Sequence, residues 1–405
     1  MEGDQTQTND VNTDSASNVS YLSDTQETAL AFVPIVPTLI SIWASCLLIR
    51  LLYKRGFKSP MRRILLALSI TDIFTSVTAA LQCFFVPRDT SRRLYAIGND
   101  ATCSYLGWGF SFSTISFFYY AALSFYFLMV VKFGMKDPVF GRRIEPYMHV
   151  SICIFSTATA TIGLALGMYG EVSAGAGCWL RVTDKCDADC IHAVGSVFGG
   201  TPFLLCTVVV VAFNLLIFCH VRGTIYEGIK KSKERWTTNL KNLRLSLSSS
   251  KHKSVTAANA QAATRVATTT TTTLTNDYVI KQVTASPDQL KRVQRVGVQS
   301  LLYCLVFLVT YIWTVVLTTK RNNTANGGGP ELEPALYPYM MLRATFIPLM
   351  GFWNLLVYVR QRYIALREQE TSRENGESSL KSFRRVIWDV DAGAGFRKPA
   401  KGSGG

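Results

Sequence analysis

Charged and histidine side chains are scarce in this chain of 405 residues. Asp, Glu, Lys and Arg make up 17% of it, and only four residues are histidine. The histidines are scattered, so the clustered ligands that a hydrolytic metal site needs are missing. The last long apolar block, 336–358, has no lysine that could form a Schiff base with retinal. We therefore expect no enzyme activity, no cofactor and no metal site.

Long apolar blocks take the place of charge, since 48% of the residues are hydrophobic. Each block is about 20 residues or longer, which matches the hydrocarbon thickness of a bilayer at the rise of a helix. One such block could be a buried core helix, but seven in succession favour a membrane protein. The expected fold class is an all-α membrane protein with a seven-transmembrane-helix bundle. The expected helices are 29–52, 64–86, 103–131, 147–169, 193–219, 296–318 and 336–358.

The net charge of +15 is distributed unevenly between the two sides of the predicted membrane. The two short loops that follow the first and third blocks are basic, whereas residues 1–28 contain acidic residues and no Lys or Arg. The positive-inside rule therefore predicts an amino terminus outside and a carboxyl terminus inside. The early residues lack the regions of a cleavable signal peptide, so the first block would direct its own insertion. We expect a multi-pass protein of the plasma membrane, with membrane lipids as partners and no nucleic acid.

The polar segments have low complexity or little apolar periodicity, which indicates disorder. We expect a disordered extracellular tail (1–28), a seven-helix membrane domain (29–367) with a disordered cytoplasmic loop at about 232–286, and a disordered cytoplasmic tail (368–405). Two glycosylation sequons, at Asn18 and Asn322, fall outside under this topology.

Four cysteines fall on the predicted outer side, where disulfides are permitted: Cys103, Cys178, Cys186 and Cys190. Four thiols allow three pairings. We favour Cys103–Cys178, which would tie the third helix to the second outer loop, with Cys186–Cys190 as a local loop. Zinc bound by Cys186, Cys190 and His192 is the alternative, but it lacks a fourth ligand and the usual spacing.

Polar residues inside the expected spans are functional candidates because they are costly in hydrocarbon. Asp72 and Asn354 lie about nine and four residues from the inner ends of their helices, so they should match in depth to within roughly 8 Å and make contact. Pro348 should bend the last helix and free backbone groups that neighbours must satisfy. With Asn214, these residues form the predicted intramembrane switch, although polar residues across helices also serve packing alone.

Two residues are candidates for ligand binding. Arg343 lies nearer the outer face, where it could face an anionic ligand or extend outward to water. Trp179 follows Cys178 in the second outer loop.

The chain resembles G-protein-coupled receptors over about 29–367. The resemblance rests on seven spans with the amino terminus outside, on Cys103 opening the third helix, on Cys178-Trp179, on Asp72, and on "PLMGFWNLLVYVR" (348–360). The Cys-Trp pair and Gly351-Phe352-x-Asn354-x-x-Val357-Tyr358 are similar to the slime-mould cyclic AMP receptor-like group and, more distantly, to the secretin and adhesion receptors. The third helix ends in "FLMVVKFGMKD" without Asp/Glu-Arg-Tyr, and the last helix has no Asn-Pro-x-x-Tyr, both of which mark the rhodopsin-like family.

The resemblance implies a receptor that transmits binding of an extracellular ligand to a cytoplasmic heterotrimeric G protein. Basic residues at the inner ends of helices three, five and six would frame a cleft for the G-protein carboxyl-terminal helix when helix six moves outward. They are Lys132, Arg222, Lys230, Lys231, Arg292 and Arg295. The alternative is that they contact anionic lipid only. A transporter-like or scaffolding membrane protein is the competing function, although the spans show no repeated halves.

Overall fold

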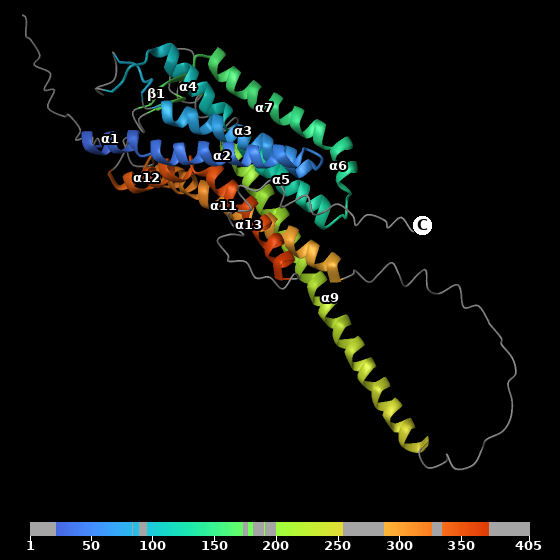
Figure 1. The fold of residues 1–405 in the computed structure, drawn as a ribbon. Coiled ribbons are helices and arrows are strands. Elements are labelled where there is room, and N and C mark those ends of the chain that lie inside the picture. Colours follow the sequence, from blue (N-terminus) through green and yellow to red (C-terminus); the bar gives the residue numbers. More distant parts are fainter. Residues whose placement is uncertain are drawn as a thin grey trace, which may run out of the picture.

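The computed structural model describes residues 22–82, 84–88, 95–172, 177–180, 190, 200–253, 287–325 and 334–371. Long helices lie side by side in a bundle, and α9 projects well beyond the others (Figure 1). Among the described residues, six helices are long and apolar enough to cross a membrane, and a bent pair, Tyr337–Phe346 with Met350–Ile364, makes a seventh span when counted as one. The expected seven-helix bundle is confirmed.

The first span is a broken helix, α1 (Asp24–Phe32) followed by α2 (Ile35–Arg55). Ser23 starts α1 with a capping box, in which its hydroxyl accepts from the Gln26 amide and its own amide donates to the Gln26 side chain. The helix thus begins inside the segment predicted as a tail, 1–28. Pro34 lies in the break, because proline has no amide hydrogen to continue the ladder. After Gly56, at a φ of 69°, the second span is α3 (Pro60–Leu81).

The third span is divided into α4 (Asp100–Phe112) and α5 (Ile115–Val131). At the division the Ser113 hydroxyl donates to the Gly109 carbonyl and the Thr114 hydroxyl donates to the Ser111 carbonyl. Such bonds compete with the helical ladder and bend it. The sequence predicted one continuous helix at 103–131, so this break was missed. A short helix, α6 (Asp137–Arg143), then leads into the fourth span, α7 (Glu145–Ala165).

A hairpin closes one end of the bundle, where β1 (Tyr169–Val172) pairs antiparallel with β2 (Gly177–Leu180). Tyr169 packs between two helices and approaches Gly107 on α4 and Gly163 on α7 so closely that a Cβ at either glycine would clash with its ring. Burial raises the pKa of the Tyr169 phenol, although its hydrogen bond with Ser111 acts the other way. The neutral phenol donates to the Ala160 carbonyl at 3.0 Å. The sequence did not predict this hairpin, and it placed the helix end at residue 169.

The predicted disulfide Cys103–Cys178 is confirmed, and it joins α4 to β2. Cys190 is also disulfide-bonded, which removes it as a zinc ligand. Its expected partner Cys186 lies outside the described residues, as does His192.

The fifth and sixth spans belong to helices longer than a bilayer requires, α9 (Thr201–Lys253) and α11 (Pro287–Ala325). The predicted cytoplasmic loop begins at residue 232, whereas α9 continues as a helix to Lys253, because its polar part contains many Lys, Arg and Leu residues, which favour helix. A 3₁₀ turn, Pro334–Leu336, precedes the last span, made of α12 (Tyr337–Phe346) and α13 (Met350–Thr371).

Buried aromatic side chains fill the centre of the bundle. Tyr120 and Phe127 of α5 lie against Phe307 and Tyr303 of α11, with ring centroids 5.4 and 6.2 Å apart respectively. The outer surface of the helices is apolar as well. On α9, Leu204, Leu205, Val208 and Leu215 are exposed. An apolar surface of this kind suits contact with lipid chains, since lipid is as apolar as these side chains.

We predict that Cys103→Ser lowers the melting temperature of the purified protein and its level at the cell surface. The disulfide spans 75 residues, and loss of such a link costs about 2–5 kcal/mol. Thermal unfolding in detergent and surface labelling measure the two effects. Cys46→Ser, at a free and exposed cysteine, is the control and should leave both values unchanged. A melting temperature equal to that of the unmodified chain would contradict the anchoring role.

Candidate functional site

A buried hydrogen-bonded cluster joins three spans near the middle of the bundle. The Asn354 amide on α13 donates to Asp72 Oδ2 on α3 at 2.8 Å. The Tyr120 hydroxyl on α5 donates to Asn354 Oδ1 at 2.9 Å. All three side chains are buried. The predicted contact between Asp72 and Asn354 is therefore confirmed, and Tyr120 is a member that the sequence did not indicate.

The cluster leaves one hydrogen-bonding position open. Asp72 Oδ1 is buried and has no partner among the described residues. A carboxylate oxygen in this setting is costly unless it is bonded, so the cluster can accept another donor if the helices shift. This makes the Asp72 cluster (Asp72, Tyr120 and Asn354) able to exchange partners.

The last span bends by 50° between α12 and α13. Pro348 lies in the break and donates no backbone bond, so the neighbouring amides use shorter turns: Leu349 donates to the Phe346 carbonyl and Met350 to the Ile347 carbonyl. The amide of Gly351 donates instead to Ser41 Oγ on α2 at 3.1 Å. The predicted bend at Pro348 is confirmed, and a hydroxyl from the first span satisfies a freed backbone donor.

Gly351 is required by close packing at this bend. A Cβ at this position would lie 2.8 Å from Ser41 Oγ and would also clash with Ser45 Oγ. The missing side chain lets α2 and α13 approach closely enough for the bond to Ser41. The bend is thus held by contacts from another span as well as by the proline.

Asn214 belongs to a separate cluster. Its amide donates to Ser124 Oγ on α5 at 3.2 Å and to the Val210 carbonyl at 2.8 Å. The Ser300 hydroxyl on α11 donates to Asn214 Oδ1 at 2.7 Å. This group, called here the Asn214 triad (Asn214, Ser124 and Ser300), links the third, fifth and sixth spans. Sequence reasoning grouped Asn214 with Asp72 and Asn354 in one switch, but these contacts place it in a second cluster.

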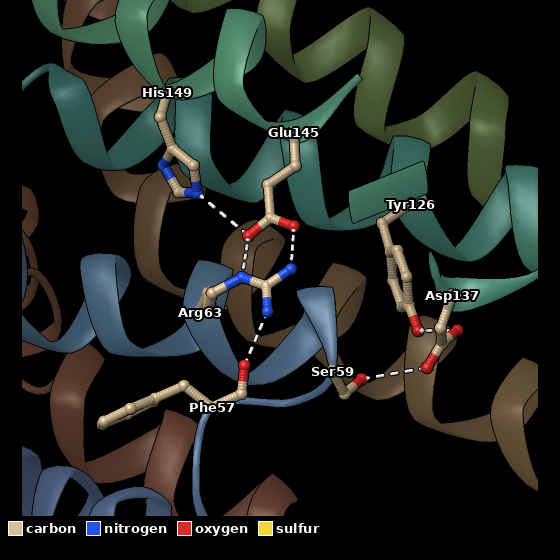
Figure 2. Close-up of polar contacts among 7 residues, drawn as sticks. All are labelled: Phe57, Ser59, Arg63, Tyr126, Asp137, Glu145 and His149. Atoms are coloured by element: carbon tan, nitrogen blue, oxygen red, sulfur yellow. Dashed lines mark hydrogen bonds and ion pairs between the residues drawn. The ribbon is translucent and has the colours of Figure 1, made fainter. Parts of the chain in front are cut away.

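An ion pair joins the beginnings of α3 and α7 (Figure 2). Arg63 Nε donates to Glu145 Oε1 at 2.6 Å, and Nη2 donates to Oε2 at 2.5 Å. Its Nη1 donates to the Phe57 carbonyl at 2.6 Å. Glu145 is buried, and His149 Nε2 lies 3.6 Å from its Oε1. Two parallel bonds of this kind fix the relative orientation of the two helices.

A second carboxylate, Asp137 at the start of α6, lies beside this ion pair in Figure 2. Ser59 Oγ donates to Asp137 Oδ2 at 3.1 Å, and Tyr126 Oη donates to Oδ1 at 3.0 Å. Asp137 thus joins α6 to α5 and to the turn before α3. The sequence analysis treated this region only as a basic loop. The sequence offered one signal of the ion pair with Arg63, because Glu145 is the single acidic residue between Asp137 and Glu171.

The two ligand-binding candidates lie on different elements. Trp179 on β2 contacts Phe110 of α4 edge to face, with ring centroids 4.7 Å apart. Arg343 is half-buried on α12, and its carbonyl accepts from the Ile347 amide immediately before the bend.

The basic residues proposed for partner contact lie at one end of three helices. Lys132 caps the carboxyl end of α5, and Arg222, Lys230 and Lys231 are exposed on α9. Arg295 is exposed on α11, while the side chain of Arg292 lies outside the described part. Because α5, α9 and α11 pack against one another, these positions share one end of the bundle. Of the two sequons, Asn322 falls in α11 and Asn18 outside the described residues.

Comparison with known proteins gives matches among the solved structures only. No family model and no curated protein matches the chain. The crystal structure of squid rhodopsin is similar with a TM-score of 0.49 and 12% identity, over 94% of this chain and 94% of that one. At this level of identity the similarity assigns no function.

We predict that Asp72→Ala and Asn354→Ala lower the melting temperature less than additively when combined. Each single change leaves a buried partner without its bond, which costs about 1–3 kcal/mol, whereas the double change removes both groups. Asn214→Ala is the matched control. It belongs to the Asn214 triad, so its effect should add to that of Asp72→Ala. Equal additivity in both pairs, measured by thermal unfolding in detergent, would contradict the proposed coupling.

We also predict that Arg63→Ala destabilises the protein and that Glu145→Gln partly restores the stability of that variant. Without Arg63 the buried carboxylate has no strong cationic partner, whereas a neutral amide needs none. Arg142→Ala, at an exposed arginine on α6, should have little effect. The melting temperature is measured for the unmodified chain, for Arg63→Ala, for the double variant and for Arg142→Ala. A double variant no more stable than Arg63→Ala would show that the ion pair is not what Glu145 requires.

Proposed function

We propose that this chain is a seven-transmembrane cell-surface receptor that transmits binding of an extracellular ligand to a cytoplasmic heterotrimeric G protein. The observation that carries the proposal is the bent last span, whose inner half is hydrogen-bonded through Asn354 to both Asp72 and Tyr120. A helix with a break in its ladder and exchangeable polar contacts can adopt two packings. A simple anchor has no need of such an arrangement.

Loop charge supports the orientation, with the amino terminus outside. The beginning of α3 carries Arg62 and Arg63, and α6 ends with Arg142 and Arg143, at the end of the bundle that would face the cytoplasm. The hairpin and the disulfide Cys103–Cys178 then lie outside, where an oxidising environment maintains the bond.

Signal transmission through this bundle would begin at α12. Arg343 lies one turn before the bend, so an anionic ligand that contacts it from the outer side would displace α12 relative to α13. Trp179 on the hairpin is the proposed second contact. A change in the bend would move Asn354 and alter its bonds to α3 and α5, which is how a local contact biases two packings of a core.

The Asn214 triad would be the second element to change. Its bonds join neutral groups, each worth about 1 kcal/mol net, so they can be exchanged at modest cost. Release of Ser300 would free α11 to move away from α5 and α9. Lys132, Arg222 and Arg295 lie five to eight residues beyond the triad on these helices, about 8–12 Å along each axis. They would then border the proposed cleft for the G-protein helix, together with Lys230, Lys231 and Arg292.

Within the receptors, we place the chain with the cyclic AMP receptor-like group. The support is the Gly351-Phe352-x-Asn354 segment, in which Gly351 permits the contact with α2 and Asn354 forms the Asp72 cluster. Both residues of the motif thus have structural roles that do not depend on the identity of the ligand.

The test is ligand-dependent G-protein activation in cells that express the chain, screened against a ligand library. We predict that combined Arg292→Ala and Arg295→Ala abolishes activation while surface level and ligand binding persist. Gln294→Ala, an exposed neutral residue between them, is the matched control and should couple normally. Full coupling by the double variant would refute the cleft as drawn.

The orientation is checked in the same cells with terminal tags. An amino-terminal tag should be labelled on intact cells, and a carboxyl-terminal tag only after permeabilisation. The reverse pattern would overturn the proposed orientation. Correct labelling without activation by any ligand would favour a transporter-like or scaffolding protein instead.

A further inference from the structure

The fifth span continues far past the bundle. α9 runs as one helix from Thr201 to Lys253, and its later turns project away from all other elements (Figure 1). Trp236 follows Arg222 by 14 residues, which is about 21 Å along the helix axis. All side chains described between residues 229 and 241 are exposed. This part of α9 therefore extends past the other described elements and is not packed against them.

Large apolar side chains form an exposed stripe along this extension: Tyr226, Ile229, Trp236 and Leu240. Their separations of three, seven and four residues put them on one face of the helix, within an arc of about 80°. Tyr226 is 70% exposed and Trp236 is 66% exposed. Single exposed apolar residues are ordinary, but an aligned row that includes a tryptophan marks a contact surface.

Basic residues surround the exposed stripe. Residues 222–241 contain six Lys or Arg and two Glu. Lys233 lies within the stripe, and Lys230 and Lys241 lie along its edge by helical spacing. The stripe therefore suits an occupant that is apolar at its centre and acidic around it.

The charge of the stripe and the direction of α9 argue against two other occupants. A second copy of the chain would bring the same cations into the same interface, where like charges repel. A membrane surface would require the helix to lie in the plane of the bilayer. The extension instead continues α9 along the axis of the fifth span.

We propose that the exposed stripe of α9 is the docking site for an acidic protein that encloses a helix in an apolar groove, with the chemistry of a calcium-loaded EF-hand sensor. Such sensors open a methionine-rich groove when calcium binds and take up basic amphipathic helices through spaced apolar anchors. Trp236 is the main anchor, and Ile229 lies seven residues before it on the same face of the helix. The proposal goes beyond receptor coupling and depends only on the proposed orientation, which puts the extension in the cytoplasm.

The position of the stripe has a consequence for coupling. Lys230, at the edge of the stripe, and Lys231, on the opposite face of α9, both border the proposed G-protein cleft. A sensor that enclosed the helix around Ile229 would cover these cations and compete with the G protein. Calcium entry would then reduce coupling without a change in ligand binding.

The experiment uses the full chain in nanodiscs of neutral phosphatidylcholine, with calmodulin as the probe and binding measured by interferometry in calcium or in EGTA. We expect saturable binding in calcium and none in EGTA. Trp236→Ala should weaken the affinity at least about tenfold, as loss of a central aromatic anchor does. Combined Lys230→Glu and Lys233→Glu should weaken it as well. Thr238→Ala, on the opposite face of α9, is the matched control and should bind normally.

Several outcomes would overturn the proposal. Absence of calcium-dependent binding, or binding that Trp236→Ala leaves unchanged, would reject the stripe as a sensor site. Two chains per disc that become one in Trp236→Ala would assign the stripe to self-association. Adsorption of the extension to anionic vesicles without calmodulin would assign it to lipid. G-protein activation is measured independently, so failure here leaves the proposed receptor function to its own test.

Discussion

The structure depends on one constraint, that a polar group within a bilayer must find its partner inside the protein because no water is present to supply one. The last span shows how this constraint organises the rest. Pro348 interrupts the ladder, and the freed Gly351 amide is satisfied by Ser41 of another span. That bond requires α2 to approach α13, and only glycine at residue 351 leaves room for the approach. The missing amide hydrogen of Pro348 therefore accounts for the bend, for the need for glycine at residue 351 and for the close packing of α2 against α13.

The same constraint divides the bundle into parts that resist motion differently. At the beginnings of α3 and α7, Arg63 and Glu145 are joined by two charge-assisted bonds. Asp137 joins α6 to α5 and to the turn before α3. Separating Arg63 from Glu145 would leave a buried carboxylate without its main cationic partner, which is far more costly than exchanging a hydroxyl bond. The Asn214 triad contains no charge. Movement should therefore be easier for α9 and α11 than for α3, α6 and α7.

Much of this arrangement could be predicted from the sequence, because it depends on depth along a helix. The number of spans follows from hydropathy and length, and the match in depth of Asp72 and Asn354 follows from counting residues from the helix ends. The bend at Pro348 follows from its missing amide hydrogen. The side on which the thiols lie limits the outer disulfides to four cysteines, and the favoured pair among them, Cys103–Cys178, is the one that the structure shows.

The remaining contacts depend on the rotation of each helix about its axis, which a single sequence does not specify. Tyr120 and Asn354 are 234 residues apart, and nothing in "SFFYYAAL" distinguishes Tyr120 from its neighbour Tyr119. Tyr119 instead faces His149 on α7. Arg63 was attributed to topology alone, since a cation in a basic loop is expected there whether or not it has a partner. The length of α9 was missed for a related reason. A polar helix without apolar support is usually unstable alone, and this one gains its nucleus from the membrane span that it continues. That continuity also explains why the exposed stripe can exist: the span holds the helix in register, so Tyr226, Ile229 and Trp236 stay aligned without a core beneath them.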